Sequence, residues 1–192
     1  MAGESLAGES DAVIFAVEML LDSSAAARVR ALWQRIAERG LPSPLLALGH
    51  TPHVSLAVCG ELAVDELVPV LRALAAREPP PRTALVSAAT FGSAEGVVFL
   101  GAVATPALVE LHGRFFPLFE RAAREPWAHY RPGAWVPHCT VTSGLDPRQV
   151  EQAIGLCVEA GLPMPVTLEG VAVVENPSGT VHARLPFAGL RS

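Results

Sequence analysis

Two short stretches of the chain place a histidine beside a hydroxyl side chain. The sequence reads PHVSL around His53 and PHCTV around His138, so each stretch gives proline, histidine, any residue, a hydroxyl and an aliphatic residue. In a β-strand, residues two apart point to the same side. His53 and Ser55 therefore share one face of their strand, and His138 and Thr140 share one face of theirs. Each strand offers an imidazole that can transfer a proton and a hydroxyl that can bind an anionic oxygen.

A pair of such strands suits a displacement at phosphorus. The attacking and leaving oxygens lie on opposite sides of the phosphorus atom, so a base and an acid must approach from opposite directions. Histidine suits both roles because its ordinary pKa of about 6.5 lets one copy be neutral and the other protonated near neutral pH. Two facing lobes that each supply one histidine would give this geometry, with Ser55 and Thr140 holding the non-bridging oxygens.

Other interpretations of these histidines stay open. A single His-x-Ser/Thr pattern is weak evidence, and a structural protein with two buried histidines would explain it, but only if both copies arose by accident of strand packing. A non-catalytic nucleotide- or RNA-binding module on the same fold is the main alternative. The intact pair disfavours that alternative, because a binding module has no need for two proton-transfer groups.

Composition narrows the class of protein. The chain has 192 residues, of which 51% are hydrophobic, and a net charge of −5, which argues against an extended surface for duplex DNA. It contains no apolar run of the roughly 20 residues that a membrane helix needs, nor the basic start of a signal peptide. The three cysteines lack metal-ligand spacing. We therefore expect a cytoplasmic protein without cofactor or metal, which acts as a monomer and binds no membrane.

The hydrophobic pattern predicts the elements that must position the two motifs. The first half should contain a strand over 12–21, a helix from Asp22-Ser23 to about Arg39, the motif strand over 53–59, a helix over 65–77, and strands near 84–91 and 96–104. The second half should contain a helix from Pro106 that Pro117 kinks or splits, the motif strand over 138–142, a helix over 147–160, and strands near 165–175 and 180–186. The alternation in the first motif strand must break near Ala57 and Val58 if both are buried.

Both halves run helix, motif strand, helix, strand, strand, which indicates an internal duplication of element order. We predict an α+β fold with two pseudo-symmetric lobes, whose mostly antiparallel sheets face a central cleft and whose helices lie outside. Residues 1–10 should form a disordered tail, and residues 11–192 a single bilobal domain.

Two Pro-His-x-Ser/Thr-aliphatic strands in a duplicated α+β chain of this length resemble the 2H phosphoesterase superfamily, in its 2′-5′ RNA ligase-like and cyclic phosphodiesterase branch. The resemblance implies that His53 and His138 are the catalytic pair and that Ser55 and Thr140 bind phosphate. It also implies an enzyme that opens 2′,3′-cyclic phosphates of RNA ends or small nucleotides, or that hydrolyses or joins 2′-5′ linkages, without a metal. Cys139, at the variable position of the second motif, should face away from the cleft.

No motif identifies the residues that bind the rest of the substrate. The segment HYRPGAWVPH leads into the second motif strand and carries the best candidates. Arg131 can pair with a phosphate, and Tyr130 or Trp135 can stack on a base, as aromatic and guanidinium planes do in single-stranded RNA recognition. The alternative for Trp135 is a lid over the core.

Overall fold

The computed structural model describes residues 13–190, so the tail expected at residues 1–10 lies outside the described residues. The strands are β1 (Ile14–Leu21), β2 (His53–Leu62), β3 (Arg82–Thr90), β4 (Val98–Ala102), β5 (Ala123–Pro126), β6 (His138–Thr142), β7 (Met164–Asn176) and β8 (Thr180–Pro186). The helices are α1 (Ser23–Glu38), α2 (Pro44–Ala47), α3 (Val64–Ala75), α4 (Pro106–Ala122) and α5 (Pro147–Glu159), with a 3₁₀ turn at Ala128–Tyr130.

The strands pair in the order β5-β2-β1-β7-β3-β4-β6, and β8 pairs with residues 170–175 of β7. Every pairing is antiparallel. We call β5, β2, β1 and β8 lobe A, and β3, β4 and β6 lobe B. The predicted α+β class with antiparallel sheets in two lobes is confirmed, but the two sheets are not separate. The long strand β7 joins them, because its start pairs with β3 and the rest pairs with β1.

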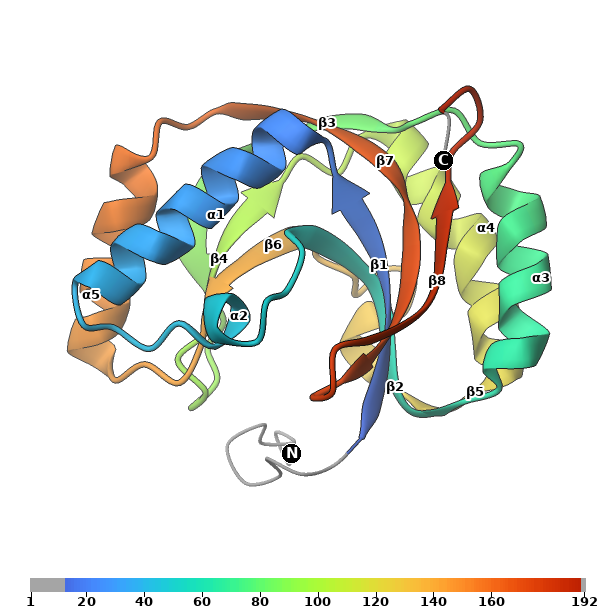
Figure 1. The fold of residues 1–192 in the computed structure, drawn as a ribbon, viewed down its shortest axis with the longest axis horizontal. Helices are drawn as coiled ribbons and strands as arrows, with labels where there is room; N and C mark the ends of the chain where they lie inside the picture. The colour runs from blue at the N-terminus through green and yellow to red at the C-terminus, as the bar shows by residue number, and fades with distance from the viewer. Residues whose placement is uncertain (1–12, 191–192) are drawn as a thin grey trace.

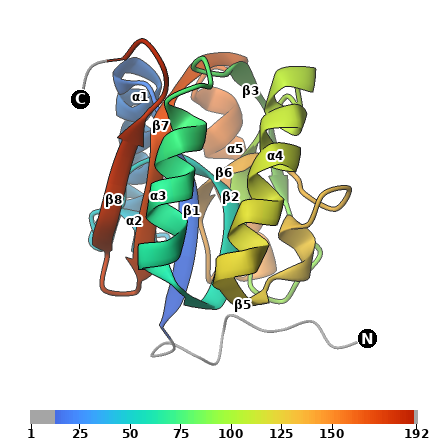
Figure 2. The same ribbon diagram turned by 90° about the vertical axis from the view of Figure 1, so that its right-hand side faces the viewer.

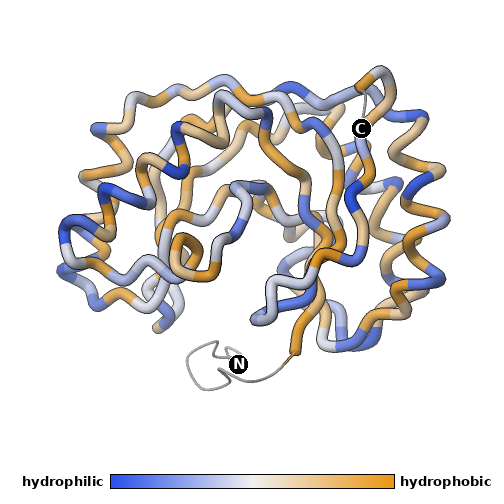
Figure 3. The backbone as a smooth tube through the Cα atoms, in the orientation of Figure 1, coloured by the Kyte–Doolittle hydropathy of each residue, from blue (hydrophilic) through white to orange (hydrophobic). Residues whose placement is uncertain are grey.

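Helices cover the outside of both lobes. Helices α1 and α5 lie on the flank of lobe B, and α3 and α4 lie on the flank of lobe A (Figure 1). The view from the side shows α3 and α4 next to each other in front of the strands (Figure 2). Hydrophilic and hydrophobic segments alternate along these helices, as expected when one face of each helix packs on a sheet (Figure 3). The sheet faces that carry the motif residues are thus left for the space between the lobes.

Local sequence explains where most elements begin. Asp22 caps α1 by accepting a hydrogen bond from the Ala25 backbone N–H, and Asp146 caps α5 in a capping box with Gln149. In the first motif strand, Ser55 pairs with Glu18 but Ala57 pairs with Val17, so Leu56 is an extra residue. This bulge is the predicted break in alternation.

Three elements differ from the sequence expectations. Pro117 does not split α4, which runs on to Ala122 with Phe115, Phe116 and Phe119 buried on both sides of the proline. Packing of these aromatic rings stabilises the helix where one backbone hydrogen bond is lost. The short elements α2 and β5 were not expected, because four residues are too few to give a hydrophobic period. No helix among residues 13–190 is both long and apolar enough to cross a membrane.

Candidate active site

The two motif histidines are the first residues of β2 and β6, and their rings are held in the same way. Nδ1 of His53 lies 2.7 Å from the carbonyl oxygen of Thr51, and Nδ1 of His138 lies 2.7 Å from the carbonyl oxygen of Val136. A carbonyl oxygen can only accept a hydrogen bond, so Nδ1 carries the hydrogen in both rings. Nε2 of each histidine is therefore the nitrogen that can accept or donate a proton to a bound molecule.

The two histidines also influence each other electrostatically although they belong to different lobes. Burial lowers the pKa of His138, the hydrogen bond to the Val136 carbonyl raises it, and positive charge on His53 and His129 lowers it further. The net effect is a pKa below the ordinary value. His138 is thus a neutral imidazole near neutral pH, which is the form that a general base requires.

The motif hydroxyls occupy matching places beside the histidines. Ser55 is half-buried, and its side chain forms a hydrogen bond with the phenol of Tyr130. Thr140 is half-buried, and its backbone carbonyl accepts a hydrogen bond from the Trp33 indole at 3.3 Å. The Trp33 contact fixes the backbone of β6, and the Tyr130 contact fixes the side chain of Ser55.

Next to His53 lies a buried carboxylate. Glu18 is opposite Ser55 in the β1–β2 ladder and is only 3% exposed. Its Oε2 atom lies 3.4 Å from Nδ1 of His53. Burial raises the pKa of Glu18, whereas the charges of His53 and Arg184 lower it. The Glu18 carboxyl group therefore lies against one ring of the histidine pair.

Next to His138 lie aromatic rings instead. Phe99 is opposite Thr140 in the β4–β6 ladder, and its ring centroid is 4.9 Å from that of His138. Phe91 stacks on Phe99 at 4.3 Å and meets His138 edge-on at 5.1 Å. Phe91 is the residue directly after the end of β3, and its side chain is half-buried. Phe99 thus takes, in lobe B, the ladder position that Glu18 takes in lobe A.

A polar pocket of about 190 Å³ adjoins the Glu18 side of the site. Its polar lining includes Glu18, His50, Thr51 and Arg184. The Arg184 guanidinium lies 3.4 Å from the Thr51 hydroxyl, and its side chain is exposed. The His50 and His53 rings are 6.4 Å apart. The Arg184 guanidinium, in the pocket that His50 and Glu18 also line, can contact an anionic group.

Of the three predicted substrate-binding residues, Arg131 and Tyr130 make contacts within the protein. Arg131 donates to Glu120 at 2.7 Å and lies over the Phe116 ring of α4. Tyr130 is only 8% exposed, so neither of its faces is open to a base.

Trp135, the third of them, stacks on the His112 ring at 4.1 Å, and its indole donates to the Ser55 carbonyl at 2.9 Å. His112 is buried and hydrogen-bonds the Leu56 carbonyl at 3.2 Å. This indole and imidazole stack supports the backbone of the first motif strand from the α4 side. Trp135 is thereby used in packing around the motif, as its alternative interpretation proposed.

Sequence reasoning missed Glu18, Phe91, Phe99 and Arg184. One signal was present for Glu18, because it is the only charged residue in the strand IFAVEMLL and all the residues around it are apolar. A carboxylate in such a strand has to be paired or functional. The aromatic pair and Arg184 gave no comparable signal, since their place beside the motifs depends on how the strands pair.

The thiols and the other polar groups add no nucleophile or metal centre. Burial raises the pKa of Cys139 to about 12, so its thiol is protonated at neutral pH. Across residues 13–190, no group of three or more His, Cys, Asp or Glu side chains is arranged to hold a metal ion. The groups that can do chemistry here are the two imidazoles, the hydroxyls and the charges around them.

Comparison with known proteins agrees with this arrangement. A family model described as the 2′-5′ RNA ligase superfamily matches residues 21–180. The structure is similar to that of E. coli LigT complexed with NADP+, with a TM-score of 0.60 and 17% identity over 91% of this chain and 96% of LigT. It is also similar to TT0787 of Thermus thermophilus, with a TM-score of 0.52 and 23% identity over 93% of this chain and 99% of that one. A search of curated proteins found no match.

The family match covers both histidine motifs and most of the described strands. It confirms the resemblance that the two Pro-His-x-Ser/Thr-aliphatic stretches indicated, and the two structures show the same fold. The chain therefore belongs to the 2′-5′ RNA ligase superfamily, among the 2H phosphoesterases.

Proposed function

We propose that the chain is a metal-independent phosphoesterase that opens 2′,3′-cyclic phosphates of RNA ends or small nucleotides. The observation that carries the proposal is the matched bonding of the two histidines. In each ring the Nδ1–H is held by the carbonyl two residues earlier in the chain, and Nε2 is the nitrogen available for proton transfer. Members of this superfamily are generally phosphoesterases or ligases, which supports a reaction at phosphorus.

The proposed reaction needs one proton acceptor, one proton donor and partners for the phosphate oxygens. One histidine takes a proton from water as the water oxygen attacks phosphorus. The other gives a proton to the ribose oxygen that leaves. The hydroxyls of Ser55 and Thr140 donate to the non-bridging oxygens, where negative charge increases in the transition state.

The surroundings of the histidines favour a nucleotide as substrate. The half-buried Phe91 ring, stacked on Phe99 beside His138, is better placed than Tyr130 or Trp135 to contact a base. Arg184 takes the role of phosphate partner that was expected of Arg131. In E. coli LigT the bound molecule is NADP+, which is itself a nucleotide. The proposal includes a monomer that acts in the cytoplasm.

Chelation separates this mechanism from a metal-dependent one. Turnover of a 2′,3′-cyclic nucleotide should be unchanged by EDTA, because the imidazoles and hydroxyls supply the acid, the base and the charge stabilisation that a metal supplies in other phosphoesterases. The measurement is the initial rate with and without prior dialysis against EDTA. Loss of activity that zinc or magnesium restores would contradict the proposal.

A further inference from the structure

The proposed reaction makes no use of Glu18, although Glu18 is the carboxylate nearest to a motif histidine. Its side chain is buried in the middle of β1, with Oε2 at 3.4 Å from Nδ1 of His53. The same nitrogen lies 2.7 Å from the Thr51 carbonyl. The Nδ1–H of His53 thus faces two acceptors, one of which carries a negative charge when ionised. When Glu18 is ionised, its charge attracts a protonated His53 ring more strongly than a neutral one.

Lobe B contains the equivalent motif strand, β6, but has no carboxylate at the position that corresponds to Glu18. In the ladders, Glu18 is opposite Ser55 whereas Phe99 is opposite Thr140. The rings of Phe91 and Phe99 lie against His138, and burial is the largest cause of its lowered pKa. Aromatic rings remove water without supplying a negative charge, so they favour the neutral imidazole. The two histidines occupy equivalent positions in the fold, but the side chains next to them differ.

Other titratable groups around His53 do not reverse this difference. Burial, and then the charge of His53, lower the pKa of His50, which keeps that ring neutral near pH 7. Burial raises the pKa of Tyr130 to about 12, and does the same for Cys139, so both of these groups are also neutral. Arg184 is positive and reaches the site from β8. Burial raises the pKa of Glu18, and the charges of His53 and Arg184 oppose that rise and favour the ionised carboxylate.

We propose that Glu18 is a positioning residue that makes His53 the proton donor and leaves His138 as the base. This inference rests on the proposed function. Water gives a proton to Nε2 of His138 while its oxygen forms a bond to phosphorus. The bond from phosphorus to one ribose oxygen breaks, and that oxygen takes the proton from Nε2 of His53. The product is a phosphate monoester, and the histidines return to their starting forms by exchanging protons with water.

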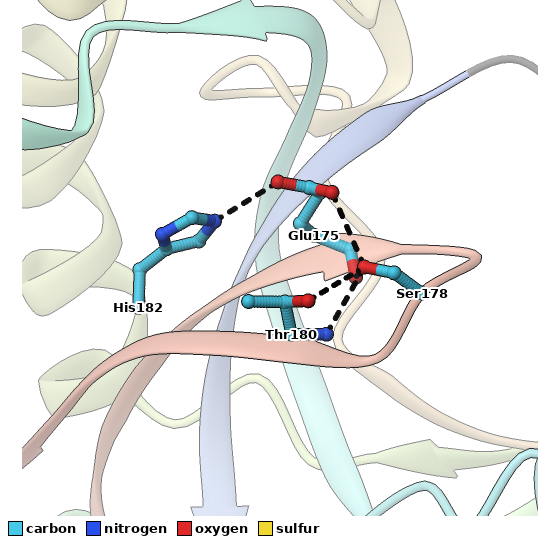
Figure 4. A network of polar contacts seen from close by, with 4 residues as sticks. All are labelled: Glu175, Ser178, Thr180 and His182. Atoms are coloured by element: carbon cyan, nitrogen blue, oxygen red, sulfur yellow. Dashed lines mark hydrogen bonds and ion pairs between the residues drawn. The ribbon is translucent and has the colours of Figure 1, made fainter.

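The test compares Glu18→Gln with a matched control, Glu175→Gln. Glu175 also pairs with a histidine, since its Oε2 lies 3.1 Å from Nε2 of His182, but this pair belongs to a network at the β7–β8 hairpin (Figure 4). In Glu18→Gln the basic limb of the pH–rate profile should move by about one unit to lower pH, which is roughly a tenfold loss of rate above the original midpoint. The acidic limb, which reports His138, should move less. Glu175→Gln should keep the profile of the unchanged protein.

A second substrate shows which proton transfer is impaired. A p-nitrophenyl ester of a 2′-deoxynucleoside 3′-phosphate has a leaving group that needs no proton and no neighbouring hydroxyl to replace water, so Glu18→Gln should cleave it nearly as fast as the unchanged protein does. His138→Ala should remain slow on the same ester, because water still needs a base. Glu18→Asp keeps the charge and should keep the shape of the pH profile. An unshifted profile in Glu18→Gln, or equal slowing on both substrates, would overturn the inference.

A measurement that needs no turnover keeps the inference separate from the proposed function. The titration of the His53 ring, followed by NMR through its Cε1 hydrogen, should move to lower pH in Glu18→Gln and not in Glu175→Gln. The ring of His138 should move less than that of His53, since the charge on His53 is only a minor cause of the pKa of His138. If the unchanged protein cleaves no cyclic phosphate but this shift appears, the proposed function fails and the pairing of Glu18 with His53 stands. If the protein is active and no shift appears, the role of Glu18 fails alone.

Discussion

His53→Ala and His138→Ala should each lower the turnover of a 2′,3′-cyclic nucleotide by on the order of 10²- to 10⁴-fold. Each variant removes one of the two Nε2 atoms that the matched Nδ1 bonds make available for proton transfer. The double variant should lose much less than the product of the two effects, because both groups act in the same transition state and are not additive. The measurement is kcat for the three variants and the unchanged protein under one set of conditions.

A packing role for these histidines would give a different pattern, and His112 supplies the control. His112 is 2% exposed, stacks on Trp135 and hydrogen-bonds the Leu56 carbonyl. Replacing it by alanine should cost about 1 to 3 kcal/mol of stability and leave the activity per folded molecule largely intact. The His53 and His138 variants should show the reverse. Clear drops in melting temperature with activity retained in both single variants would show that the assignment is wrong.

Ser55→Ala and Thr140→Val should give the second largest losses, on the order of 10²- to 10³-fold in kcat each, as for other groups that hold a developing negative charge. Both side chains share a strand face with a motif histidine. Valine has the shape of threonine without its donor, so the second change removes a hydrogen bond and little packing. The effect should fall on kcat more than on KM, because the bonds strengthen as charge increases on the non-bridging oxygens.

Tyr130→Phe is the matched control for Ser55. It removes the phenol that hydrogen-bonds the Ser55 side chain and keeps the buried ring. We expect a smaller loss of kcat than in Ser55→Ala, because the serine hydroxyl remains and only its orientation is less restricted. If Tyr130→Phe and Ser55→Ala were equally slow while Thr140→Val kept full activity, the two hydroxyls would not share one role.

The parts of the fold that depend on local chemistry were predictable from the sequence. The prolines before His53 and His138 and the period-two pattern after them placed both motif strands at their observed first residues. Asp22 marked the start of α1, and Pro147 the start of α5. Even the bulge at Leu56 had a signal, since Ala57 and Val58 are both apolar and cannot both face the core in a regular strand.

The parts that depend on pairing between distant segments were not predictable. Nothing in the order of the strands indicated that β7 would join both lobes, or that Glu18 would lie opposite Ser55. The segment from Tyr130 to Trp135 enters the second motif strand, which suggested contact with substrate. Its side chains instead pack on α4 and on the first motif strand. Nearness in sequence to a motif does not fix the side to which a loop turns.

Phosphorus NMR of a 2′,3′-cyclic nucleotide incubated with the protein in EDTA is the decisive test of two-histidine catalysis. The cyclic phosphate signal should disappear and a single monoester signal should replace it, since one fixed acid and one fixed base select one leaving oxygen. The His53→Ala/His138→Ala protein, at the same concentration, should leave the cyclic phosphate intact over the same period. A cyclic signal that persists with the unchanged protein, or a monoester that forms equally fast with the double variant, would contradict the account.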